Sequence, residues 1–163
     1  MPVDNLFTTP LFSKFIKKKI SSKNTICVSP DMGGVARTRA LATRLKADLA
    51  IIDKRRPAPG KSQVMNIIGD VKNKTCIIVD DIIDSGGTII NAVDALKKEG
   101  AKEVYVFITH AVLSGEAAKK IKNSKIKKLI ITDSIDNSNK IKNNNKIEVL
   151  SISSLMSEAI KRI

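Results

Sequence analysis

Short continuous runs of apolar residues recur along the chain, separated by polar loops or by stretches with helical spacing. A run of this kind, bounded by charged or polar residues, is typical of a strand that is buried on both faces. The pattern predicts strands at residues 25–29, 49–53, 75–79, 104–109, 128–132 and 147–150, with a further apolar segment at residues 64–68.

Helices are predicted between most of these strands. Residues 35–46 and the stretch that follows Gly87 carry apolar residues at helical spacing. A short helix is predicted at residues 115–121, and a closing amphipathic helix towards the end of the chain. Residues 54–63 and 136–146 are polar and are predicted to be surface loops, the first of them mobile.

Strands that alternate with helices indicate an α/β fold in which a mainly parallel sheet is flanked by helices. The chain has 163 residues, which fits a single domain over residues 1–163, and it contains no internal repeat. Ligands of such sheets bind at the carboxyl ends of the strands. The unusual polar residues of this sequence follow predicted strands, so we expect them to gather at that edge.

The strongest candidate site begins where the strand at residues 75–79 ends. An acid pair, two apolar residues, a third acid and a loop of small residues lead into a helix: Asp80, Asp81, Ile82, Ile83, Asp84, Ser85, Gly86, Gly87 and Thr88. The glycines allow a positive φ and a close approach of the backbone to an anion, and N–H groups at a helix start favour phosphate. The acid pair could accept hydrogen bonds from sugar hydroxyls or face a hydrated Mg²⁺.

A capped helix with solvated acids would use the same residue types, because Ser, Thr, Asp and Gly are common at helix starts. Three carboxylates beside a phosphate-type loop repel one another, however, unless a sugar or a cation joins them. This repulsion favours a binding site over a structural cap.

A second glycine-containing loop follows the strand at residues 25–29 and contains Asp31, Met32, Gly33 and Gly34. Its backbone N–H groups could hold a pyrophosphate, with Asp31 on a bridging metal ion. An ordinary tight turn is an equally good interpretation of this loop taken alone. Arg37, on the following helix, is interpreted as facing the anion.

Three consecutive cations, Lys54, Arg55 and Arg56, follow the strand at residues 49–53. A loop that carries them could close over reacting phosphates and neutralise the charge that develops on their oxygens. A basic surface loop is the simpler interpretation of such a run.

The net charge of +13 arises from 29 basic and 16 acidic residues. Such a charge could attract nucleic acid or anionic lipid, but no aromatic residues lie within the lysine runs to stack on bases. We therefore predict a lysine-rich solvated surface and no nucleic-acid partner. No apolar run approaches the ~20 residues of a membrane span, and no signal peptide is evident, so we expect a cytoplasmic protein without a membrane partner. Cys27 and Cys76 lie in apolar runs and are predicted to be reduced core residues.

Four motifs together resemble those of the ribose-phosphate pyrophosphokinases, which make phosphoribosyl pyrophosphate from ribose 5-phosphate and ATP. They are S-P-D-x-G-G at residues 29–34, D-K-R-R-P at 53–57, M-N-I-I-G-D-V at 65–71 and V-D-D-I-I-D-S-G-G-T at 79–88. The last is also similar to the phosphoribosyl-binding signature of the type I phosphoribosyltransferase fold. The resemblance covers nearly the whole chain and is to the second, C-terminal domain of the family.

The resemblance implies a role for each motif. Lys54 and Arg56 are the implied catalytic residues, which stabilise the transition state from a mobile loop. The implied ribose 5-phosphate ligands are Asp80, Asp81, Asp84, Ser85, Gly86, Gly87 and Thr88. The implied pyrophosphate loop is Asp31, Met32, Gly33 and Gly34, with Asp31 near Mg²⁺. His110 is the only histidine and is interpreted as structural.

The family's enzymes have a further N-terminal domain that supplies most ATP contacts, and nothing in this chain resembles it. The implied reaction transfers the diphosphate group of Mg-ATP to C1 of ribose 5-phosphate, and we expect the isolated chain to turn over poorly or not at all. The implied partners are ribose 5-phosphate, phosphoribosyl pyrophosphate, ATP and either further copies of the chain or a chain with the N-terminal domain. Two alternatives stay open: a phosphoribosyltransferase that uses phosphoribosyl pyrophosphate, and a non-catalytic regulatory homologue.

Overall fold

The computed structural model describes residues 3, 5–20, 23–55 and 64–162, and these form one seven-stranded sheet with helices on both faces. The strand order is β3-β2-β1-β4-β5-β6-β7. The strands are β1 (Thr25–Ser29), β2 (Asp48–Arg55), β3 (Val64–Ile68), β4 (Thr75–Ile83), β5 (Glu103–Ala111), β6 (Lys128–Thr132) and β7 (Ile147–Leu150). Neighbouring strands are parallel except for β2 and β3, which are antiparallel. The predicted α/β fold is confirmed.

The helices are α1 (Thr9–Lys19), α2 (Val35–Leu45), α3 (Gly87–Lys98), α4 (Ala117–Asn123), α5 (Ser138–Ile141) and α6 (Ser153–Ile160). In the described part of the chain, none of them is both long and apolar enough to cross a membrane. The helix α1 was not predicted from the sequence; its buried face combines Phe12 and Ile16 with the polar Thr9 and Ser13. Residues 136–146 were predicted to be a loop throughout, and this prediction was wrong at the short helix α5.

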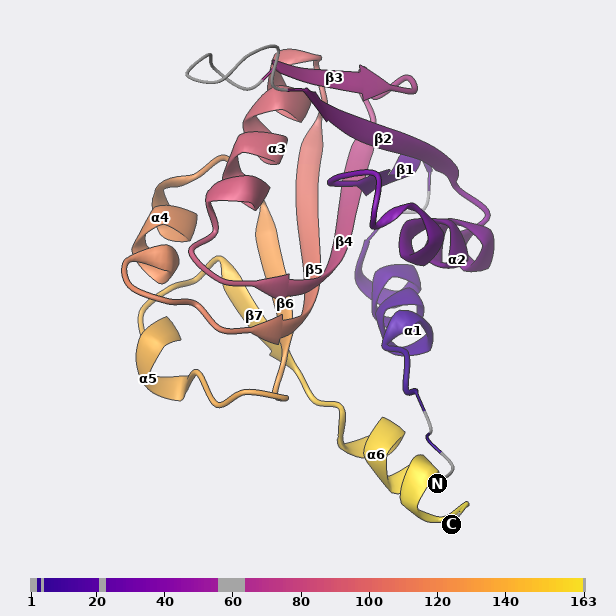
Figure 1. Ribbon diagram of the computed structural model, residues 1–163, viewed down its shortest axis with the longest axis vertical. Helices are drawn as coiled ribbons and strands as arrows, with labels where there is room; N and C mark the ends of the chain where they lie inside the picture. Colours follow the sequence, from indigo (N-terminus) through magenta and orange to yellow (C-terminus); the bar gives the residue numbers. More distant parts are fainter. Residues whose placement is uncertain (1–2, 4, 21–22, 56–63, 163) are drawn as a thin grey trace.

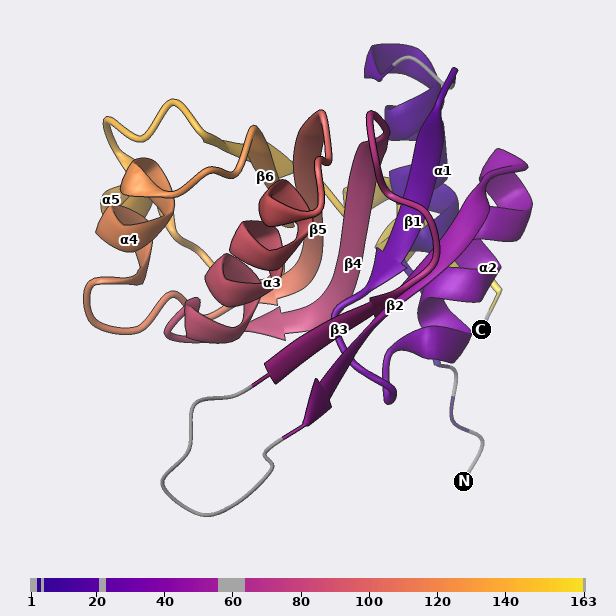
Figure 2. The same cartoon turned by 90° about the horizontal axis from the view of Figure 1, so that it is seen from above.

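The hydrophobic core has two layers because successive side chains of a strand point to opposite faces of the sheet. On β4, Cys76 and Ile78 belong to the layer under α3 and α4, while Ile77 and Val79 belong to the layer under α1 and α2. Figures 1 and 2 show α3, α4 and α5 over one face of the sheet and α1 and α2 over the other.

Most of the few aromatic residues of the chain gather in the layer under α1 and α2. The ring centroid of Phe107 on β5 lies 5.3 Å from that of Phe12 and 5.9 Å from that of Phe15, in tilted and edge-on geometry. Such pairs are favourable beyond the apolar area that they bury. They attach α1 to the centre of the sheet.

Both cysteines lie in the hydrophobic core, as predicted: Cys27 in the layer under α1 and α2, and Cys76 in the layer under α3 and α4. Cys27 and Cys76 are free and buried, and burial raises the pKa of each thiol to about 12. Each thiol is therefore protonated at neutral pH and contributes as a small apolar side chain.

The strand β4 is longer than the apolar run that predicted it. The apolar run predicted an end at residue 79, but the ladder with β5 continues past that point and pairs Asp80 with Ile108 and Ile82 with His110. The acid pair therefore lies within the end of a strand rather than in a loop. Because β1, β2 and β4 are mutually parallel, their carboxyl ends and the loops that follow lie at one edge of the sheet.

Candidate functional site

The acid pair at the end of β4 contacts a cation from α2. Arg37, in the first turn of α2, forms ion pairs with both carboxylates: Nη1 with Oδ1 of Asp80, and Nη2 with Oδ2 of Asp81 at 2.7 Å. The backbone N–H of Asp81 also donates to Oδ1 of Asp80, at 3.0 Å. Arg37 was interpreted from the sequence as facing the anion. The structure instead places its guanidinium on the two acids.

The environment of Asp80 opposes its ionisation. Burial is the main cause of a raised pKa for this carboxyl group, and the neighbouring Asp81 raises it further. The backbone hydrogen bond from Asp81 and the guanidinium of Arg37 act in the opposite direction. Asp80 is thus a partly buried acid whose carboxylate form is disfavoured by burial and favoured by the N–H of Asp81 and by Arg37.

The loop after β4 opens the helix α3 with its backbone donors available. Gly86 has a φ of 77° and stands at the N-cap, where no side chain makes a capping hydrogen bond. The predicted positive φ is confirmed at Gly86, whereas Gly87 begins the helix itself. Asp84, Ser85 and Thr88 are exposed around this helix start. Uncapped N–H groups and the positive end of the helix dipole suit a phosphate group.

The loop after β1 is held in shape by its own polar groups. The Ser29 hydroxyl donates to the backbone oxygen of Asp31 at 2.7 Å, and the Gly34 N–H donates to Oδ1 of Asp31 at 3.0 Å. A Cβ atom on Gly34 would lie only 2.9 Å from the Ser29 hydroxyl oxygen. Met32 and Gly33 are exposed at the tip of this loop. The loop is therefore a specific, tightly packed structure at the start of α2.

The third predicted motif is only partly described. Lys54 is partly buried near the carboxyl end of β2, at the same edge of the sheet as the other two motifs. Arg56, the second predicted catalytic residue, lies outside the described residues. Within the described residues, no group of three or more His, Cys, Asp or Glu side chains could hold a metal ion, and the metal role of Asp31, a single carboxylate beside a phosphate-bound ion, stays a prediction.

Comparison with known proteins gives the family. The model of the phosphoribosyl synthetase-associated domain matches residues 56–163, well over half of the chain. The chain belongs to this family. Its resemblance to ribose-phosphate pyrophosphokinases, inferred above from four motifs, is confirmed by the relatives that follow.

Curated relatives of this phosphoribosyl synthetase-associated domain bear the name ribose-phosphate pyrophosphokinase. The relative from Bradyrhizobium diazoefficiens is 56% identical over 162 residues, which are 99% of this chain and 51% of the relative. The relative from Haemophilus influenzae is 51% identical over 164 residues, or 100% of this chain and 52% of the relative. The chain therefore spans about half the length of the curated relatives that it matches.

Solved structures agree with this assignment. The phosphoribosylpyrophosphate synthetase of Mycobacterium smegmatis matches with a TM-score of 0.89 and 35% identity, over 98% of this chain and 51% of that one. A purine phosphoribosyltransferase from Pyrococcus horikoshii matches with a TM-score of 0.55 and 25% identity, over 66% of this chain and 73% of that one. The domain thus shares its fold with phosphoribosyltransferases and is most similar to a synthetase among these two.

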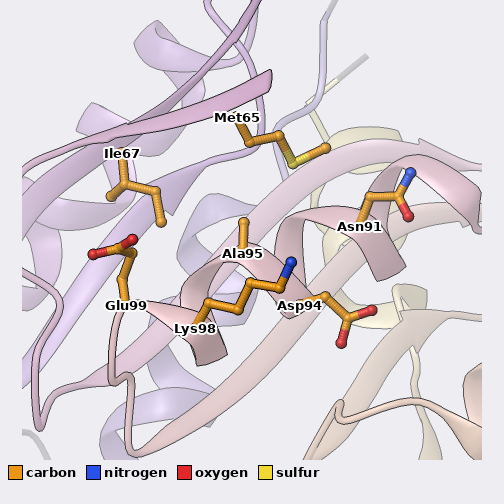
Figure 3. Close-up of a pocket in the computed structure, with 7 residues that line it drawn as sticks. All are labelled: Met65, Ile67, Asn91, Asp94, Ala95, Lys98 and Glu99. Carbon is orange, nitrogen blue, oxygen red and sulfur yellow. The ribbon is translucent and has the colours of Figure 1, made fainter. Parts of the chain in front are cut away.

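Two cavities formed by the described residues do not include the acid pair. A cavity of about 430 Å³ lies between β3 and α3, and Figure 3 shows its lining residues: Met65 and Ile67 from β3, Asn91, Asp94, Ala95 and Lys98 from α3, and Glu99 just after α3. None of these is a predicted site residue. A more open cavity of about 640 Å³, formed by residues 5–10, α2 and α6, includes Gly33 and Arg37 and borders the site.

His110 has the hydrogen bond expected of a structural histidine. Its Nδ1 lies 3.0 Å from the hydroxyl of Ser134, which also donates to the backbone oxygen of Thr109 at 2.9 Å. Sequence reasoning missed the pairing of Arg37 with Asp80 and Asp81. Nothing in the spacing indicates it, because the pairs join residues that are 43 and 44 positions apart.

Proposed function

We propose that this domain forms the ribose 5-phosphate side of a ribose-phosphate pyrophosphokinase. The complete enzyme would transfer the diphosphate group of Mg-ATP to the C1 hydroxyl of ribose 5-phosphate, giving phosphoribosyl pyrophosphate and AMP. The observation that carries the proposal is that Asp80 and Asp81 lie near the end of β4, and the short loop after that strand leads into the uncapped start of α3. The family and the names of the relatives support it.

The two halves of ribose 5-phosphate match this arrangement chemically. A pentose phosphate has a vicinal diol and, a few bonds away, a phosphate dianion. Carboxylates accept hydrogen bonds from both hydroxyls of a diol, and a helix N-terminus receives the phosphate. Asp80 and Asp81 would take the diol, and Asp84, Ser85, Gly86, Gly87 and Thr88 would surround the phosphate.

The loop of Asp31, Met32, Gly33 and Gly34 would hold the diphosphate on C1. It lies beside the acid pair because β1 and β4 are neighbouring parallel strands. Successive backbone N–H groups form an anion-binding concavity of the kind that a diphosphate requires. The exposed tip at Met32 and Gly33 leaves this backbone accessible to a ligand.

The one carboxylate that the loop offers, that of Asp31, fits a Mg²⁺ ion only if phosphates and water supply most of the other ligands. Asp31 offers a carboxylate, and Mg²⁺ in nucleotide enzymes is commonly bound through one or two carboxylates together with substrate phosphates. When bound, Mg²⁺ would neutralise charge on the diphosphate oxygens. Asp31 would orient the loop through its hydrogen bond from Gly34 and present its second oxygen to the hydrated ion.

Lys54 and Arg56 would supply positive charge during the transfer. Diphosphate transfer places charge on non-bridging oxygens, and positioned cations stabilise that charge. Lys54 lies at the correct edge of the sheet for this role. ATP would bind mainly through the part of the relatives that this chain does not span. The chain would therefore assemble with further copies of itself or with a chain that supplies that part.

Isothermal titration of the purified chain tests the proposal, with ribose 5-phosphate and phosphoribosyl pyrophosphate as ligands, each with and without Mg²⁺. We expect wild-type binding and its loss in Asp80→Ala/Asp81→Ala. Asp48→Ala/Asp70→Ala is the matched control, because it removes two exposed carboxylates that pair with Lys74 at the opposite edge of the sheet. Equal binding by both double variants would contradict the proposed site. Release of pyrophosphate that depends on an added purine or pyrimidine base would instead indicate a phosphoribosyltransferase.

A further inference from the structure

Arg37 contacts both carboxylates of the proposed sugar site at once. Its side chain is 32% exposed, against 18% for Asp80 and 56% for Asp81. The guanidinium reaches from the first turn of α2, and it joins one oxygen of each acid. Two neighbouring carboxylates from one strand are thereby held by a single planar group from another element.

This contact leaves a defined set of acceptor atoms. Arg37 uses Oδ1 of Asp80 and Oδ2 of Asp81, and the Asp81 N–H also uses Oδ1 of Asp80. The other oxygen of each carboxylate accepts no hydrogen bond from a donor among the described residues. An ionised carboxylate has about four lone-pair sites, so the pair keeps enough acceptor capacity for two hydroxyl groups while Arg37 stays in place.

The geometry requires an arginine rather than any cation. A guanidinium presents its N–H donors in a rigid fork, whereas an ammonium group is a compact point charge on a flexible stem. The fork can hold two carboxylates at a fixed mutual angle and offset their repulsion. Both Nη atoms of Arg37 are engaged with the acids in this way.

We propose that Arg37 is the positioning residue of the sugar site, which holds Asp80 and Asp81 so that their remaining oxygens accept the two hydroxyls of a vicinal diol. The inference rests on the proposed function and adds to it the residue that selects ribose over sugars without a diol. Arg37 acts through the two acids and touches neither the phosphate nor the reacting C1 oxygen.

The test compares two sugars in four proteins: the wild type, Arg37→Ala, Arg37→Lys and the control Arg39→Ala. Arg39 lies two residues further along α2 and is exposed, so its removal deletes the same charge without the contact to the acids. The ligands are ribose 5-phosphate and 2-deoxyribose 5-phosphate, measured by isothermal titration at one salt concentration. Circular dichroism and thermal unfolding confirm that each variant is folded.

We expect Arg37→Ala to weaken the binding of ribose 5-phosphate roughly 10- to 100-fold, which is the effect of one or two charge-assisted hydrogen bonds that are no longer oriented. The binding of 2-deoxyribose 5-phosphate should weaken by a clearly smaller factor, because this sugar lacks one of the hydroxyls that Asp80 and Asp81 are proposed to recognise. Arg37→Lys should resemble Arg37→Ala, and Arg39→Ala should stay within about 2-fold of the wild type.

Several results would overturn the inference. Equal factors for the two sugars, or full affinity in Arg37→Lys, would show that Arg37 contributes charge or stability and not orientation. Unchanged binding in both Arg37 variants, beside a wild type that binds ribose 5-phosphate, would refute the role of Arg37 and leave the proposed function intact. A wild type that binds neither sugar would refute the proposed function and this inference together.

Discussion

Gly34 occupies a position at the start of α2 where even a methyl group does not fit. Its φ of −82° is open to any residue, so space and not backbone conformation requires a glycine here. A Cβ atom would lie 2.9 Å from the hydroxyl oxygen of Ser29, which is itself fully buried. That hydroxyl cannot move without breaking its 2.7 Å hydrogen bond to the backbone oxygen of Asp31. We therefore predict that Gly34→Ala destabilises the domain and distorts the loop proposed to bind diphosphate.

Three contributions determine the size of the effect. Overpacking of a well-packed site costs about 1–3 kcal/mol. Loss of the hydrogen bond from Ser29 adds about 1 kcal/mol. Replacement of glycine by alanine restricts the unfolded chain and returns about 0.4–1 kcal/mol. The sum predicts a loss of about 2 kcal/mol in the free energy of unfolding, which lowers Tm by roughly 4–8 °C in a domain of this size.

A double-mutant cycle isolates the contact between the two residues. Ser29→Ala removes the obstructing oxygen and should cost about 1 kcal/mol through its lost hydrogen bond. In that background Gly34→Ala should cost almost nothing, so the coupling energy between the two sites is about 2 kcal/mol in the favourable direction. Gly33→Ala is the control: its nearest neighbour would be Oδ1 of Asp31 at 3.4 Å, close to an ordinary contact, and its φ is not positive.

Urea unfolding of the four proteins and the control, followed by circular dichroism, measures these differences. Additive effects of Ser29→Ala and Gly34→Ala would refute the steric argument, because each substitution would then act independently of the other. A Gly33→Ala variant as unstable as Gly34→Ala would also contradict it, since the loop would then be sensitive to any added methyl group.

Two further perturbations follow from the same geometry. Gly69 has a φ of 119°, and a Cβ atom there would lie 2.9 Å from Cβ of Ala50. Gly69→Ala should therefore lower the free energy of unfolding, measured by urea titration, by roughly 2–5 kcal/mol. A loss below about 1 kcal/mol would contradict this packing. The pKa of Asp80 is raised mainly by burial, so the folded chain binds a proton at this carboxyl group more readily than the unfolded chain. The contribution of Asp80 to stability is therefore complete at acid pH and is lost as the pH rises through its raised pKa. The stability of the wild type relative to Asp80→Asn should therefore fall between acid and neutral pH in paired urea titrations, and a constant difference would show that the pKa is unshifted.

Local sequence was sufficient for much of this architecture. A buried parallel strand must be apolar on both faces, so β1, β4 and β6 are evident as continuous apolar runs. The positive φ of Gly86 follows from the special backbone that the loop before a helix start requires. The four motifs in order also indicated the family, since each depends on residue type and spacing alone.

Other features depended on contacts that no local pattern contains. The helix α1 was missed because polar Thr9 and Ser13 share its buried face, and only packing against Phe107 and the sheet makes that face interior. The strand β4 continues through Asp80 and Asp81 because β5 supplies the pairing backbone there, although the side chains are charged. Strand order likewise came from pairing between distant segments.

The contact between Arg37 and the acid pair shows, at the site itself, the same difference between what local sequence determines and what tertiary contacts determine. The sequence by itself determined which residues carry charge and which loops can bind an anion, because residue type and spacing establish those properties. Whether Arg37 faces a ligand or the two acids was decided only when the parallel pairing of β1 with β4 placed the start of α2 beside the end of β4. Charged side chains act over a few ångströms, and only the folded sheet sets distances of that kind between residues more than forty positions apart.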